Sequence, residues 1–152
     1  MEKAKVYFTD FRTVANGDGL TNKLKKLIRK AGIGNIDMEG KFVAIKMHFG
    51  EQGNLSFLRP NYARAVVDVV KELGGKPYLT DCNTLYPGSR KNALEHLQCA
   101  WENGFTALTV VYLPLRVHLN FGISSRTTFS LCLGLTTRIA FLPWGAFSKQ
   151  TR

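Results

Sequence analysis

The feature that most constrains the fold is an apolar run, followed by an amphipathic segment and then by a second β-rich run. Residues 42–49 are almost continuously apolar, as expected for a central strand covered by helices on both faces. Residues 60–73 place their apolar side chains on one helical stripe, and Pro60 suits a first helical turn. Residues 78–82 are again rich in β-forming residues. Because parallel neighbours are joined by such a crossover, this order predicts a βαβ unit.

Similar patterns flank this unit on both sides. Residues 5–11 are rich in β-forming residues and predict a first strand, and residues 20–31 predict a helix that stops at Gly32. A third helix is predicted after an N-cap at Ser89. Its expected buried residues are Ala93, Leu94, Leu97, Ala100 and Trp101. The predicted fold is therefore an α/β domain over residues 3–108, with an open parallel sheet of successive βα units.

The chain changes character near residue 108. Residues 103–152 contain 5 basic residues and no acidic residue, and their apolar positions follow neither the strand period nor the helix period for long. We interpret residues 109–152 as an atypical tail, either frame-shifted sequence or an unusual C-terminal subdomain. We expect this tail to be poorly packed and to be the first part removed by a protease.

The overall composition restricts the class of protein. The net charge of +10 would suit a nucleic-acid partner, but half of the excess lies in the tail, so nucleic acid is disfavoured. The three cysteines form no C-x-x-C pair, which argues against a disulfide framework or a zinc ribbon. The chain starts without a leader-like pattern, and its one long apolar stretch is interrupted by Gly134 and Pro143. We therefore expect a cytoplasmic protein without a membrane partner.

Polar residues stand at the carboxyl ends of all three predicted strands. These ends lie on one edge of a parallel sheet, where ligands usually bind. The residues at this edge are Asp10, Lys46, His48, Asp81, Cys82 and Asn83. His48 could be a metal ligand, a general base or a histidine capped by a loop carbonyl. The Asp81 to Asn83 run could hold a cation or orient a substrate, although a cysteine at a strand end is often only a small buried residue.

Two loops before predicted helices could bind an anion. One contains Gly50 and Gly53 and ends at Arg59, and the other contains Arg90. Neither the phosphate-loop nor the dinucleotide fingerprint is present. His96, in the third predicted helix, is interpreted as a surface residue.

Five short segments of the chain form a recognisable set, namely KFVAIKMHFGE at 41–51, RP at 59–60, GGKP at 74–77, TDCNTLY at 80–86 and RKNA at 90–93. Together they resemble the family called domain of unknown function 362, whose members are often labelled iron–sulfur centre proteins. The resemblance covers residues 3–110 and implies a site at His48, Glu51, Asp81, Cys82 and Asn83. Family members are roughly twice as long, and many carry cysteine-rich motifs in the half that this chain lacks. A four-thiolate cluster is therefore expected in full-length relatives rather than in this chain.

Two hypotheses about function follow. In the first, the chain is the N-terminal part of a metal-linked or iron–sulfur-linked redox protein, with a transition metal at His48, Asp81 and Cys82. In the second, it is a phosphate- or small-molecule-binding enzyme domain that uses Lys46, Arg59 and Arg90. The reaction and the catalytic residues stay open.

Overall fold

The computed structural model describes residues 5–13, 15 and 17–110, together with the backbone of three short strands further along the chain. The elements are α1 (Leu20–Lys30), the 3₁₀ turn η1 (Ile33–Asn35), β1 (Phe42–Lys46), α2 (Pro60–Glu72), β2 (Lys76–Cys82), α3 (Ala93–Glu102), α4 (Ala107–Val110), β3 (Arg116–His118), β4 (Thr128–Leu131) and β5 (Thr137–Phe141). Within these residues, no helix combines the length and the apolar character needed to cross a bilayer.

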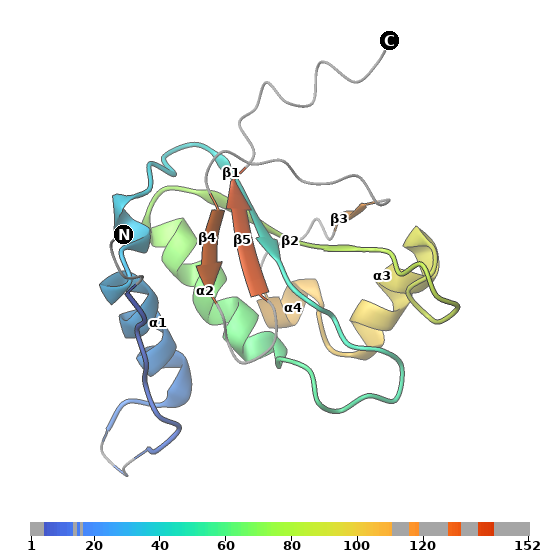
Figure 1. Ribbon diagram of the computed structural model, residues 1–152, viewed down its shortest axis with the longest axis horizontal. Coiled ribbons are helices and arrows are strands. Elements are labelled where there is room, and N and C mark those ends of the chain that lie inside the picture. Colours follow the sequence, from blue (N-terminus) through green and yellow to red (C-terminus); the bar gives the residue numbers. More distant parts are fainter. Residues whose placement is uncertain are drawn as a thin grey trace.

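The predicted βαβ unit is present and forms the centre of the sheet (Figure 1). β1 and β2 are parallel neighbours, with Lys46 opposite Thr80, and β3 extends the parallel part beyond β2. The α/β fold with an open parallel sheet is thus confirmed. On its other edge β1 pairs antiparallel with β5, and β5 pairs antiparallel with β4, so the complete order is β3-β2-β1-β5-β4. Three short backbone stretches of the predicted tail therefore belong to the sheet, and most other residues of that tail lie outside the described residues.

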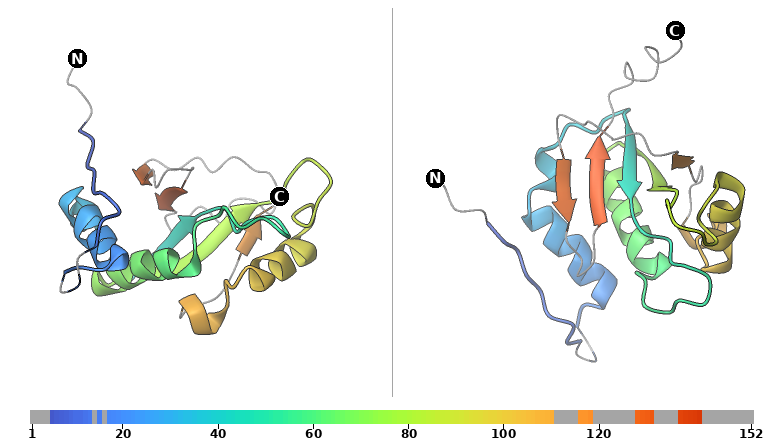
Figure 2. Two further views of the ribbon diagram at one scale, coloured as in Figure 1. Left: turned by 90° about the horizontal axis from the view of Figure 1, so that it is seen from below. Right: turned by 45° about the vertical axis from the view of Figure 1, so that its right-hand side comes forward.

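The described helices lie on one side of β1 and β2 (Figure 2), so the expectation of helices on both faces of β1 is wrong for the described part of the chain. α1 packs beside α2, and α2 packs on β2. The core between the helices and the sheet includes Val43 and Ile45 of β1 and Val66 and Val70 of α2. An apolar run shows that both strand faces are buried, but it does not show which kind of element covers each face.

The predicted strand over residues 5–11 does not form. This segment runs beside α1 in an extended course, and Val6, Phe8 and Phe11 are exposed. The Lys23 ammonium holds the segment at its end, because it donates to the Asp10 carboxylate at 2.6 Å and to the Asp10 carbonyl oxygen at 2.9 Å. The edge of β1 that faces away from β2 is paired with β5. β-forming residues make a strand only where a neighbouring edge accepts their hydrogen bonds, and this edge is taken.

α3 begins later and is rotated relative to the prediction. Asn92 is its N-cap, since its side chain accepts the Glu95 N–H at 3.0 Å, so the assignment of Ser89 as N-cap is wrong. The buried face consists of His96, Cys99 and Ala100, whereas Leu94 is 80% exposed and Trp101 is also exposed. The interpretation of His96 as a surface residue is therefore wrong. Both residue sets have helical spacing, so periodicity alone could not choose between them.

We expect Asn92→Ala to lower the free energy of unfolding by about 1 kcal/mol, because it removes the acceptor of the Glu95 N–H. Asn92→Asp keeps a capping oxygen and serves as the control, with a change of only a few tenths of a kcal/mol. Urea denaturation of both variants measures the difference. Equal loss in both variants would show that the cap contributes nothing.

Candidate functional site

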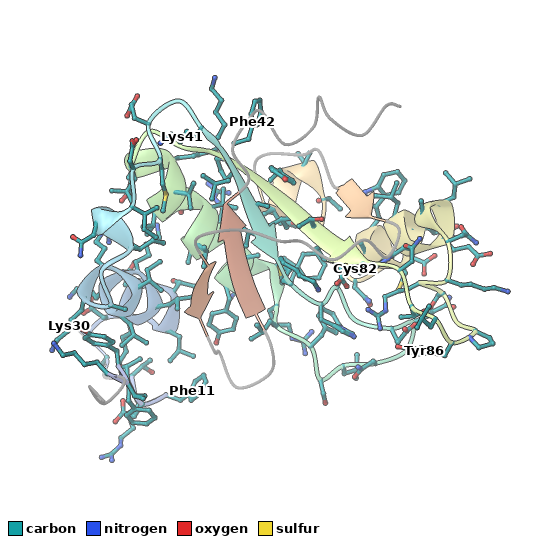
Figure 3. All side chains as sticks on the ribbon, turned by 45° about the horizontal axis from the view of Figure 1, so that its top comes forward. Phe11, Lys30, Lys41, Phe42, Cys82 and Tyr86 are labelled. Atoms are coloured by element: carbon teal, nitrogen blue, oxygen red, sulfur yellow. The ribbon has the colours of Figure 1, made fainter. Side chains whose placement is uncertain are left out.

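The carboxyl ends of β1 and β2 come together as the sequence predicts, and both lead into loops that pack on α3. Figure 3 shows Cys82 at the end of β2 and Tyr86 on the following loop, on one side of the molecule, and Phe11 on the other side near α1. Asp10, which precedes Phe11, is paired with Lys23 and Arg12. The prediction that Asp10 shares an edge with His48 and Asp81 fails because residues 5–11 are not a strand of the sheet.

Asp81 is the centre of the site and is only 5% exposed. Its Oδ1 accepts the Lys46 ammonium at 2.9 Å and the Cys82 backbone N–H at 2.8 Å. Its Oδ2 accepts Arg90 Nη1–H at 3.2 Å and lies 3.5 Å from His96 Nε2. Burial by itself would raise the pKa of Asp81, but the His96 contact and the Lys46 charge outweigh it and lower the pKa. Asp81 is therefore a carboxylate at neutral pH.

Arg90 connects Asp81 to the loop after β1. This guanidinium is buried, and its Nε donates to Glu51 Oε1 at 2.6 Å while Nη2 donates to the Tyr86 hydroxyl at 2.7 Å. Glu51 also accepts the Ser89 hydroxyl at 3.0 Å. Each guanidinium nitrogen thus has a protein partner. Arg90 therefore links the loop after β1 to the end of β2 and the loop that follows it. This differs from the anion-binding role considered from the sequence.

His48 lies just beyond β1 and is exposed. Its Nδ1 accepts the Gly50 backbone N–H at 2.9 Å, so the proton of the neutral ring is on Nε2. Partial burial and the nearby Arg90 charge lower the pKa of His48, which keeps the ring neutral at pH 7. His48 is therefore capped by a backbone N–H, not by a carbonyl, and presents Nε2–H as a hydrogen-bond donor.

The remaining predicted residues have different surroundings. Arg59 is exposed, and its guanidinium carbon lies 5.6 Å from the centre of the Phe57 ring. Asn83 is buried and contacts His96, with Oδ1 at 3.1 Å from Nδ1. Cys82 is partly buried at the strand end. The sequence reading missed His96, Tyr86 and Ser89 as members of the site. For His96, the available signal was its spacing of three and four residues from Cys99 and Ala100.

The donor set does not suit a metal ion. Among the described residues, no three or more His, Cys, Asp or Glu side chains are grouped so that they could hold a metal. Asp81 is already bonded to Lys46 and Arg90, and a cation at its oxygens would face two positive charges. His48 carries its proton on Nε2, the nitrogen that would have to coordinate. Cys82 and Cys99 are the described thiols, while Cys132 lies outside the described residues.

We expect Gly50→Ala to destabilise the protein by about 1–3 kcal/mol more than Gly53→Ala. Both glycines have a positive φ, +83° and +78°, so both substitutions carry the backbone strain of an L-residue. At Gly50 a Cβ would also lie 2.7 Å from Asn103 Nδ2 and from Phe57 Cδ1, whereas at Gly53 nothing lies within 4 Å. Thermal or urea unfolding of the pair measures the contribution of packing. Equal destabilisation would mean that the loop at Gly50 is free to rearrange.

We expect the stability of the protein to fall in acid partly through Asp81. Its pKa is lower in the folded chain, so its contribution is complete above the unfolded pKa of about 4 and is lost as the pH falls through the folded value. Asp81→Asn should remove this part of the slope and, at pH 7, lower the free energy of unfolding by about 3–5 kcal/mol. Asp37→Asn, at an exposed ion pair with Lys41, is the control and should change little. Denaturation curves at several pH values test this, and unchanged acid sensitivity in Asp81→Asn would contradict it.

Comparison with known proteins gives a family match that covers the strand ends described above. No curated protein and no solved structure gives a significant match to the chain. The family model described as Domain of unknown function (DUF362) matches residues 43–122, which is slightly more than half of the chain. The match starts in β1 and includes β2 and α3. It also includes Asp81 and the residues linked to it, here called the Asp81 cluster: Lys46, Glu51, Asn83, Tyr86, Ser89, Arg90 and His96. The chain therefore belongs to the DUF362 family.

Proposed function

We propose that this domain binds a small molecule through an oxyanion, either a carboxylate or a phosphate, at the carboxyl ends of β1 and β2. Lys46 and His48 are the binding residues. They stand two residues apart at and just after the end of β1. In an extended chain, side chains two residues apart point to the same side. The observation that carries the proposal is that Asp81 holds the Lys46 ammonium in place while part of that side chain stays open to solvent.

Lys46 is suited to this role because it is anchored and incompletely used. Its side chain is 34% exposed, and Nζ donates to Asp81 Oδ1 at 2.9 Å. An ammonium has three N–H groups, and among the described residues Asp81 accepts one of them, which leaves two for a ligand. A lysine already held by a buried carboxylate also loses less rotamer freedom on binding than a free surface lysine.

The charges of the cluster are balanced before any ligand arrives. Asp81 and Glu51 are matched by Lys46 and Arg90, and His48 is neutral. The two carboxylates are therefore neutralised, and they do not repel an oxyanion that approaches the N–H groups of Lys46 and His48. The Nε2–H of His48 supplies a further donor at the same strand end.

The metal-linked hypothesis is less well supported by this geometry. A metal at His48, Asp81 and Cys82 would require Asp81 to release Lys46 or Arg90 and His48 to move its proton to Nδ1, which already accepts the Gly50 N–H. An iron–sulfur cluster, which the family resemblance implies for longer members, needs thiolates in addition to Cys82 and Cys99.

Titration with inorganic phosphate and with acetate, followed by ¹H–¹⁵N NMR, tests the proposal. We expect the backbone signals of residues 46–52 and 80–84 to shift. Lys46→Gln should weaken phosphate binding about tenfold or more, because a charge-assisted hydrogen bond is lost. Lys30→Gln makes the same change of charge on α1, on the other side of the molecule (Figure 3), and should have no effect. Equal weakening by both variants would show only non-specific attraction to a basic protein.

A parallel measurement separates the two hypotheses. Thermal unfolding is followed with phosphate, with Zn²⁺ and with Fe²⁺, since a ligand that binds the folded state raises the melting temperature. Stabilisation by phosphate that is lost in Lys46→Gln supports the oxyanion site. Stabilisation by a metal that is lost in a His48→Ala, Cys82→Ala double variant would overturn it in favour of the metal-linked reading.

A further inference from the structure

Behind the proposed ligand site lies a buried polar pair that the oxyanion does not touch. His96 is completely buried and Asn83 almost so. Nδ1 of His96 lies 3.1 Å from Asn83 Oδ1, and Nε2 lies 3.5 Å from Asp81 Oδ2. Within the described part of the chain, His96 Nε2 and Asn83 Nδ2 are the buried side-chain polar atoms without a hydrogen-bond partner. An unpaired buried polar atom is destabilising, so the arrangement of protons here matters.

Two arrangements of this pair are chemically distinct. In a neutral ring that faces Asn83 Oδ1, Nδ1 of His96 must carry the proton, and Nε2 then turns a lone pair toward the Asp81 carboxylate. Two acceptors would face each other in a buried place. If the Asn83 amide is turned by half a rotation, its Nδ2–H donates to Nδ1 and the ring proton moves to Nε2, which points at Asp81 Oδ2.

The second arrangement gives Asn83 Nδ2 an acceptor and places an N–H of His96, in place of a lone pair, 3.5 Å from Asp81 Oδ2. It leaves the Asn83 carbonyl oxygen as the atom without a partner, and an unpaired acceptor is better tolerated in protein interiors than an unpaired donor. The His96 ring packs on Phe49 in an edge-to-face arrangement, with 5.8 Å between ring centres and the planes at 71°, so the imidazole plane is the same for either amide orientation.

We propose that His96 is a positioning residue for Asp81. It donates Nε2–H to Asp81 Oδ2, and Asn83 selects this tautomer by donating to Nδ1. Asp81 in turn holds Lys46, so α3 determines where the ligand-binding ammonium stands. The part of this inference that concerns Lys46 rests on the proposed oxyanion site, whereas the tautomer of His96 does not.

Long-range ¹H–¹⁵N NMR of the histidine rings tests the tautomer in the 152-residue chain without any ligand. The chain has three histidines, and comparison with the spectrum of His96→Gln identifies the His96 signals. We expect the Nε2–H form in the wild type. Asn83→Asp offers Nδ1 an acceptor only, so this variant should shift His96 toward the Nδ1–H form. A wild-type ring in the Nδ1–H form would overturn the inference.

His96→Gln and His96→Asn test the positioning role as a matched pair of amides. The longer Gln can still reach Asp81, and the shorter Asn cannot. The Cys82 backbone N–H, which donates to Asp81 Oδ1 at 2.8 Å, reports the place of the carboxylate. We expect its NMR signal to move in His96→Asn and to stay near its wild-type position in His96→Gln. Unchanged Cys82 signals in both variants would overturn the positioning role.

Phosphate affinity completes the test. His96→Asn should bind phosphate about tenfold more weakly, and His96→Gln should bind within about twofold of wild type. Equal affinity of the two variants, together with unchanged Cys82 signals, contradicts the inference. If the wild type itself does not bind phosphate or acetate, the oxyanion site is wrong, and the tautomer and the Cys82 signal still decide the role of His96.

Discussion

The buried Asp81 carboxylate is the interaction on which the rest of this site depends. A buried charge is strongly unfavourable unless it is paired and hydrogen-bonded. Here the pairing comes from three separate parts of the chain, namely Lys46 at the end of β1, Arg90 in the loop before α3, and His96 within α3. Satisfying one carboxylate therefore fixes two strand ends and a helix relative to one another.

This arrangement also determines which cations are available for chemistry. Arg90 divides its nitrogens among Asp81, Glu51 and Tyr86, so it acts as a connection between loops. Within the described part of the chain Lys46 has one such bond and is 34% exposed, and the Nε2 of His48 lies on the side of the ring away from the Gly50 N–H. Among the described residues, Lys46 and His48 at the end of β1 thus keep N–H groups without a protein acceptor, whereas the nitrogens of Arg90 are all bonded. The segment that matches the DUF362 family model contains all of these residues.

α3 links the site to the hydrophobic core. Its inner face combines His96 with Cys99 and Ala100, and Cys99 donates its S–H to the Gly50 carbonyl oxygen at 3.4 Å. Phe49 packs between His96 and Phe105, so the loop after β1 enters the core directly after the exposed His48. Because the same short segment supplies a core residue, a glycine turn and a polar rim, its geometry is tightly constrained.

The sequence alone determined the βαβ unit, because residues 60–73 have the helical period and the runs on either side are short and rich in β-forming residues. It also determined that His48 and Asp81 emerge at one edge, since parallel strands end on the same side. Tertiary structure decided the rest. The β-forming residues 5–11 stayed outside the sheet because strand formation depends on a free neighbouring edge, and β5 occupies that edge of β1. His96 turned inward, and Leu94 outward, because two sets of positions on α3 have the same period, and only tertiary contacts of His96 with Asn83, Phe49 and Asp81 distinguish them.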